Sequence, residues 1–221
     1  MQVSALDQFD PKVNLILRAY TREADGALTP YAERRLHNVM TTTGRNWLVR
    51  LLGASNNSAS PPTAHTTAKI KYIGLGVGGC LQTDTRLLAT QVEHAGVLAL
   101  EDPVPFSVSG TTATYLKAVR NQVAGTQFFP GDGRTLFVLD VLETEVSFSG
   151  SAARGSGTVL NTAVPVSEAG LYLSTATPTY DQTNNLGVDP TAANQLVCYG
   201  VFDPVPVNPN TVLRVEWELR L

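Results

Sequence analysis

Short and frequent β-type segments are the feature that most constrains how this 221-residue chain folds. From Val97 onward these segments alternate with clusters of Gly, Pro, Ser and Asn, which are typical of turns. Repeated short strands with such turns between them predict an antiparallel β-sandwich or a jelly roll. The expected strands cover residues 97–100, 113–119, 136–148, 170–174, 195–202 and 212–221.

Two segments show the strict alternation of a strand with one face on a core. Residues 12–20 alternate apolar and polar side chains, and residues 212–221 do so to the last residue. Both segments are therefore expected to be half-buried strands. The apolar positions are Val13, Leu15, Leu17 and Ala19 in the first, and Leu213, Val215, Trp217, Leu219 and Leu221 in the second.

A helical segment is expected over residues 29–53. Thr29 suits a helix N-cap, and Pro30 suits the first helical position. Residues 41–44 interrupt the pattern, which predicts a broken helix or a helical hairpin. The apolar positions at helical spacing are Ala32, Leu36, Val39 and Met40, and then Trp47, Leu48, Leu51 and Leu52.

The polar residues 54–67 contain two adjacent prolines and predict an exposed loop. A linker between domains is the alternative. However, about 53 residues with one strand and a broken helix are few for independent folding. We therefore expect residues 1–221 to form a single β-sandwich domain with a short N-terminal helical segment.

Gly74, Gly76 and Gly79 satisfy the dinucleotide-binding spacing G-x-G-x-x-G after a strand-like run. Glu93 and Asp102 lie about 20 residues further on, where such sites place an acidic residue. That chemistry also needs a parallel sheet built from βαβ units, and the rest of the chain shows none. The alternative is a glycine-rich strand exit where backbones approach closely. We therefore expect no cofactor.

No arrangement typical of catalysis or metal binding stands out. His37, His65 and His94 lack the spacing of metal ligands, and no serine lies in a G-x-S-x-G elbow. Glu143 and Glu145 share one side of a strand and resemble a glycosidase pair, but a solvated strand end explains them better. The sequence therefore predicts no catalytic residues and no enzyme.

Two further features point to structural rather than chemical roles. Residues 181–187 look like a calcium loop, but the glycine falls one place late and no glutamate closes the loop. Cys80 and Cys198 are too few for a disulfide framework, and both are expected to be buried free thiols. No metal ligands are predicted, although a weak ion site at residues 181–187 is an open alternative.

Charge and hydropathy exclude two classes of partner. The net charge is −3 with no basic stripe, and Arg34 with Arg35 is expected to be a solvated helix face, so we expect no direct nucleic acid partner. No apolar run approaches the roughly 20 residues that span a bilayer, and the N-terminus lacks a secretory pattern. We therefore expect no membrane partner and a cytosolic site of synthesis. The charged share of 16% is low, as for a surface that faces other protein.

Five motifs occur in a characteristic order. They are Y-I-G-x-G-x-G at 72–78, D-T-x-L-L-x-x-Q-V at 84–92, E-A-G-L-Y at 168–172, L-V-C-Y-G-V-F-x-P-V at 196–205 and L-R-V-E-W-E-L-R-L at 213–221. In this order the chain resembles a loose group of virion structural proteins of tailed bacteriophages. More faintly, it is similar to the N-terminal regions of phage tail-fibre proteins. The resemblance covers residues 29–221. No repetitive shaft follows the last strand, so a receptor-binding fibre in one polypeptide is not expected.

The resemblance implies a non-enzymatic structural component of a tailed-phage virion. Such a subunit repeats in the neck or collar, tail or baseplate, and binds itself as a symmetric homo-oligomer and neighbouring virion proteins. It is located in the virion, is assembled in the host bacterial cytoplasm and has no small-molecule substrate. One alternative is a capsid decoration or cement protein. Another is a carbohydrate-binding sandwich with an aromatic groove, for which the candidates are Tyr115, Tyr172, Tyr180 and Tyr199.

The candidate interface is a proline-rich segment before the last strand. Its prolines lack an N–H donor, so the segment is expected to lie extended and to reach a neighbouring subunit. The alternative is an ordinary loop. The N-terminal dozen residues invite the same pair of interpretations. The interface residues are Asp203, Pro204, Val205, Pro206 and Val207.

Overall fold

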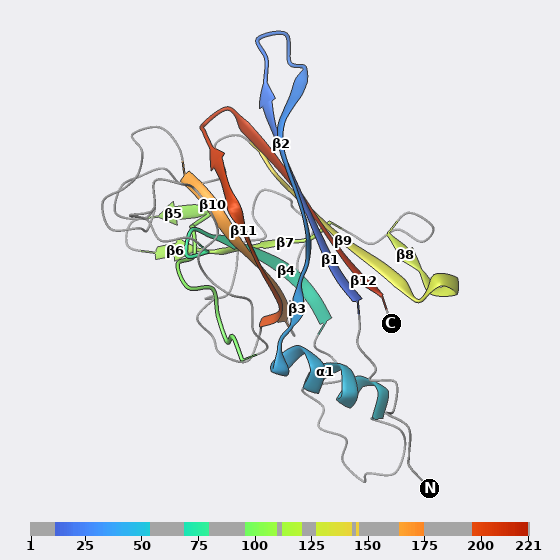
Figure 1. Cartoon of the computed structure of the whole chain (residues 1–221). Helices are drawn as coiled ribbons and strands as arrows, with labels where there is room; N and C mark the ends of the chain where they lie inside the picture. The colour runs from blue at the N-terminus through green and yellow to red at the C-terminus, as the bar shows by residue number, and fades with distance from the viewer. Residues whose placement is uncertain are drawn as a thin grey trace, which may run out of the picture.

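The computed structural model describes residues 12–53, 69–79, 96–109, 112–120, 127–142, 145, 164–174 and 196–220. These residues form two five-stranded antiparallel sheets that pack together, so the predicted β-sandwich is confirmed (Figure 1). Sheet A has the order β2-β1-β12-β9-β8, and sheet B has the order β3-β11-β10-β4-β7. The expected loop at 54–67 lies outside the described residues.

The strands of sheet A are β1 (Lys12–Arg22), β2 (Leu28–His37), β12 (Thr211–Arg220), β9 (Arg134–Val141) and β8 (Phe128–Phe129). Those of sheet B are β3 (Val39–Met40), β11 (Leu196–Val207), β10 (Val164–Ser174), β4 (Lys69–Gly76) and β7 (Leu116–Ala118). A separate pair comprises β5 (Ser107–Ser109) and β6 (Thr112–Thr114), and a 3-10 turn, η1 (Pro130–Asp132), joins β8 to β9.

The main core lies between the sheets, and β1 and β12 supply its centre. The alternation expected for both segments is confirmed up to Leu219, because their apolar positions to that point are buried in one cluster, while Leu221 lies outside the described residues. The strands pair antiparallel, with Leu15 opposite Trp217 and Leu17 opposite Val215. Trp217 is fully buried. Side chains with period 2 thus form one continuous apolar surface across the two strands.

The expected helix over residues 29–40 is wrong, because residues 28–37 form strand β2, which pairs with β1. Positions 32 and 36 are four apart, a spacing that fits period 2 as well as period 3.6. The deciding feature is the turn at Asp25 and Gly26, where Gly26 has φ 87°. The resulting β1–β2 hairpin projects beyond the sandwich (Figure 1).

A single helix, α1 (Thr42–Gly53), accounts for the rest of the expected helical segment. Thr41 is its cap, since the Thr41 hydroxyl accepts a hydrogen bond from the Gly44 amide at 3.0 Å. Gly44, which was expected to interrupt the helix, lies within it. A Cβ there would lie 2.3 Å from the Val197 carbonyl oxygen, so this glycine allows α1 to pack closely on β11.

Sheet B also buries its outer face. A second apolar cluster there includes Tyr72, Leu100, Leu116, Tyr172 and Tyr199. Residues 97–100, expected to be a strand, instead form an irregular segment that covers this face. Their apolar side chains are therefore explained by burial under a loop and not by sheet pairing.

The other expected strands lie close to observed ones. Residues 113–119 correspond to β6 and β7, and residues 136–148 overlap β9, which ends at Val141. The expected strands at 170–174 and 195–202 are parts of longer strands, β10 and β11. β11 runs on to Val207 and includes the whole candidate interface.

Candidate functional site

The carboxylate of Glu168 is the most unusual polar group in the described structure. Glu168 lies on β10, on the outer face of sheet B, and is 0% exposed. Its Oε1 accepts hydrogen bonds from the amides of Asp102 at 2.8 Å and Gly78 at 3.1 Å. Its Oε2 accepts bonds from the Glu101 amide at 3.1 Å and the Tyr199 hydroxyl at 3.0 Å. We call this group the Glu168 clamp.

The glycine motif is part of the clamp. A Cβ on Gly76 would lie 2.3 Å from Glu168 Oε1, and one on Gly78 would lie 2.8 Å from the same atom. A Cβ on Gly79 would lie 2.1 Å from the Ser167 carbonyl oxygen. These glycines therefore leave room for a buried carboxylate and a neighbouring backbone. This agrees with a glycine-rich strand exit, the alternative to a dinucleotide site.

Electrostatics and geometry assign the clamp a structural role. Burial raises the pKa of Glu168, and hydrogen bonds from the Asp102 and Glu101 amides, the Tyr199 hydroxyl and the Gly78 amide oppose that shift. All four donors belong to the chain itself, and the carboxylate has no exposed surface. A general acid or base needs a reactant within hydrogen-bond reach. The arrangement instead fixes residues 101–102 onto strands β4, β10 and β11.

The candidate interface lies inside strand β11. Val205 and Val207 are buried in the main core, Pro204 is also buried, and Asp203 is half-buried. Only Pro206 is exposed. Val205 pairs with Val166 on β10, so the expectation of an ordinary loop is wrong. An interface role for these five residues stays a prediction.

Side chains from β2 cover the carbonyl groups of this part of β11. Arg34 Nε donates to the Asp203 carbonyl at 3.2 Å, and the Tyr31 hydroxyl donates to the Pro206 carbonyl. Arg34 was expected on a solvated helix face, but it bridges the two sheets at one edge of the sandwich. Prolines and covering side chains both protect a sheet edge from pairing with another chain. The proline-rich sequence is thus explained by edge protection.

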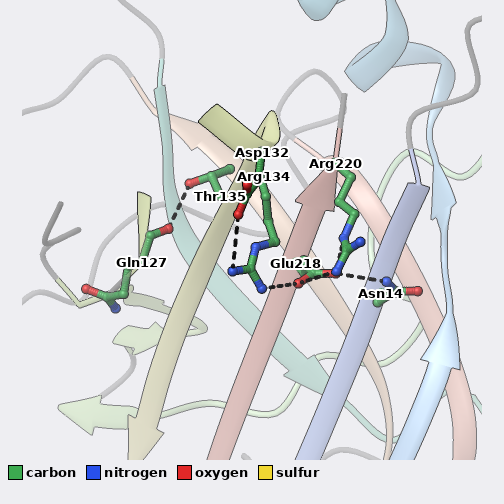
Figure 2. A network of polar contacts seen from close by, with 7 residues as sticks. All are labelled: Asn14, Gln127, Asp132, Arg134, Thr135, Glu218 and Arg220. Carbon is green, nitrogen blue, oxygen red and sulfur yellow. Dashed lines mark hydrogen bonds and ion pairs between the residues drawn. The ribbon is translucent and has the colours of Figure 1, made fainter. Parts of the chain in front are cut away.

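The outer face of sheet A carries ion pairs in rows across the strands. In one row, Arg18 joins Glu33 on β2 and Glu216 on β12, each at 2.8 Å. Figure 2 shows another row, where Glu218 accepts hydrogen bonds from Asn14 at 3.1 Å, Arg134 at 3.2 Å and Arg220 at 2.7 Å. This face is therefore solvated and highly charged.

We expect the Glu218 row to contribute to acid sensitivity. Burial alone raises the pKa of Glu218, but hydrogen bonds from Arg220, Asn14 and Arg134 together hold it below its ordinary value. A carboxyl with a lowered folded-state pKa contributes stability above its unfolded pKa of about 4.3, and loses it as the pH falls through the lower folded value. Glu218→Gln should therefore destabilise the fold at pH 7 by about 1 kcal/mol and by less at pH 3. Urea unfolding at both pH values checks this, and an equal loss at both would contradict it.

Other residues singled out in the sequence are dispersed. His37 is exposed on β2, while His65, His94, Glu93, Cys80, Glu143 and residues 181–187 lie outside the described residues. Cys198 is a buried free thiol, as predicted, and burial raises its pKa. Glu145 forms an ion pair with the buried Lys117. Burial lowers the pKa of Lys117, and the hydrogen bond and charge of Glu145 oppose that shift.

The aromatic groove of the carbohydrate-binding alternative does not form from the candidates described. Tyr172 and Tyr199 are 0% and 4% exposed and belong to the second apolar cluster. Tyr115 is half-buried, and Tyr180 lies outside the described residues. Two of the four tyrosines therefore serve packing rather than sugar binding.

Glu168 itself was missed by the sequence reasoning. The available signal was a single acidic residue in the otherwise uncharged strand VPVSEAGLYLS. A charge in such a strand is buried only with partners. Within the described ranges, no group of three or more His, Cys, Asp or Glu side chains is placed to hold a metal ion. None of the helices described there is long and apolar enough to cross a membrane.

The fold and the clamp define an antiparallel β-sandwich that contains a buried carboxylate with four hydrogen-bond donors from its own chain. A comparison with protein-family models gave no match to the chain. Comparisons with curated proteins and with solved structures gave no match either.

Proposed function

We propose that the protein is a non-enzymatic structural subunit of a tailed-phage virion, in the neck or collar, tail or baseplate. The order of the five sequence motifs, which resembles that of virion structural proteins, is the first support for this function. Three of these motifs lie on or extend from β4, β10 and β11, which are neighbours in sheet B. Gly76, Gly78, Glu168 and Tyr199 come from these three motifs and meet at the Glu168 clamp.

This convergence supports the proposal because it makes the motifs one physical unit. Short motifs scattered over a surface would carry little information, whereas residues that must fit one another constrain each other. Fold alone does not specify function, so the virion context still depends on the resemblance.

The projecting β1–β2 hairpin also suits a subunit that contacts neighbours. Leu28 and Tyr31 on β2 are 44% and 40% exposed, with the Tyr31 hydroxyl hydrogen-bonded to the Pro206 carbonyl of β11. Exposed apolar and aromatic side chains at the base of a projecting arm are typical interface material. In the assembled virion we expect this arm to lie against another protein.

Mass spectrometry of purified particles tests the proposal. Phage particles would be propagated from the genome that encodes the chain and then separated on a density gradient. Peptides of this chain should sediment with the major capsid protein at a constant ratio across the particle fractions. Recovery of the chain only from soluble fractions would overturn the proposal. Cryo-electron microscopy of the same particles distinguishes a tail or neck position from head decoration.

A further inference from the structure

Strand β2 offers an open hydrogen-bonding edge. It is the terminal strand of sheet A, with β1 on its only paired side. The Asn38 amide donates to the Val13 carbonyl at 2.9 Å, so Asn38 and Val13 form a hydrogen-bonded pair between β2 and β1. Hydrogen-bonded and non-hydrogen-bonded residue pairs alternate along antiparallel strands. The backbone amides and carbonyls of Leu36 and Arg34 therefore also point toward β1. The amides and carbonyls of Glu33 and Arg35 therefore point outward.

This edge is less protected than that of β11. Arg34 Nη1 donates to the Glu33 carbonyl at 3.1 Å, and a carbonyl oxygen can accept a second hydrogen bond. A bulge opposite Ala19 and Tyr20 and the residue Pro30 interrupt the strand near the hairpin. From Ala32 to His37, however, β2 contains no proline. Its alternate side chains Glu33, Arg35 and His37 are exposed on the outer face. The open edge thus comprises six residues whose outward side chains are mainly charged.

We propose that a second copy of this chain pairs antiparallel with β2 across this edge, on a two-fold axis at Arg34. The inference rests on the self-association that the proposed function requires. The pairing joins sheet A of each copy into one continuous sheet. About four backbone hydrogen bonds would form at Glu33 and Arg35 of both copies. A two-fold interface of this kind is closed, so it makes a dimer and not a fibre.

Charge complementarity selects the register. The outward backbone groups of one copy must face the outward backbone groups of the other. The two-fold axis can therefore fall at Glu33, Arg34 or Arg35. An axis at Glu33 places two carboxylates opposite each other, and an axis at Arg35 places two guanidinium groups opposite each other. The axis at Arg34 places Glu33 opposite Arg35 of the second copy, twice. It also places the two Arg34 residues opposite each other on the other face, where the carbonyls of Asp203 and Pro204 of its own β11 hold each guanidinium. Two opposite-charge pairs against one like-charge pair still favour this register over the other two. Opposite charges directly across a strand pair stabilise it, and like charges destabilise it.

The ion pairs within one copy are compatible with this register. Glu33 already contacts Arg18 and Arg35 in its own chain. Arg35 is 67% exposed, so its side chain is free to contact a second carboxylate. Arg34 on the axis points to the other face, toward the Asp203 carbonyl of its own β11.

Charge reversal tests the pairing on the purified full-length chain by sedimentation equilibrium. Glu33→Arg and Arg35→Glu should each raise the dimer Kd at least about tenfold, because like charges then face each other. The double variant Glu33→Arg/Arg35→Glu should return the Kd to within about threefold of wild type. Glu216→Gln is the control, since it removes an Arg18 partner two strands from the edge and should leave the Kd unchanged.

Cysteine cross-linking tests the register. In a Cys80→Ser background, Arg34→Cys should form a disulfide dimer under mild oxidation, because the two Cα atoms lie within reach on the axis. Thr29→Cys is the control: in this register its two copies are ten residues apart along the strands, about 33 Å. Equal cross-linking of both variants would overturn the register.

A wild-type chain that stays monomeric at about 1 mM, or an oligomer insensitive to both charge reversals, would overturn the pairing itself. Neither result would affect the particle mass spectrometry. The two proposals can therefore fail separately.

Discussion

Glu168→Ala should lower the free energy of unfolding by about 3–5 kcal/mol. The substitution leaves the amides of Gly78, Glu101 and Asp102 and the Tyr199 hydroxyl without their acceptor. A buried donor that loses its partner costs about 1–3 kcal/mol, and costs at one site do not add fully. Chemical denaturation followed by circular dichroism measures the loss. A loss below about 1 kcal/mol would show that water replaces the carboxylate and that the clamp is dispensable.

Two milder variants keep the test informative if Glu168→Ala does not fold. Tyr199→Phe removes a single donor and should cost about 1 kcal/mol. Glu168→Gln keeps one oxygen acceptor and avoids a buried charge, but it places an NH₂ group against existing donors. We expect its cost to lie between those of Tyr199→Phe and Glu168→Ala. A Glu168→Gln variant more stable than wild type would mean that the charge costs more than its hydrogen bonds return.

The clamp also shows how far the sequence alone leads. Strands with alternating faces, such as β1 and β12, could be predicted because each side chain's burial depends on its own position in a period of two. The free thiol at Cys198 followed from composition. Glu168 could not be placed, because its environment is built from segments 66 and 90 residues away in the sequence. No local sequence pattern indicates that the backbone amides of Gly78 and Asp102 donate to this carboxylate.

The prediction of a helix over the residues of β2 was wrong for a different reason. Ala32 and Leu36 fit both a helix and a strand, and Thr29 with Pro30 resembles a helix start. The turn at Asp25 and Gly26 decides the outcome, since it returns the chain alongside β1 and provides a pairing edge. Tertiary pairing thus overrode local propensity. Because Arg34 was placed on a helix, its hydrogen bond to the Asp203 carbonyl of β11 could not be predicted.

Gly76→Ala should destabilise the fold by about 3 kcal/mol. The new Cβ would lie 2.3 Å from Glu168 Oε1 and 2.7 Å from the Asp102 carbonyl oxygen. Both atoms are held in place, one by hydrogen bonds and one by the backbone, so neither gives way cheaply. Thermal unfolding and urea titration measure the effect.

Gly131→Ala is the matched control. Gly131 lies in η1, and a Cβ there would meet nothing within 4 Å. The same added methyl group should therefore change stability by less than about 0.5 kcal/mol, or stabilise slightly by restricting the unfolded chain. If both alanines were tolerated equally, the glycine motif would not be needed to make room for Glu168. A large loss at Gly76 alone would tie the motif to the buried carboxylate, because the two substitutions differ only in what surrounds the added carbon.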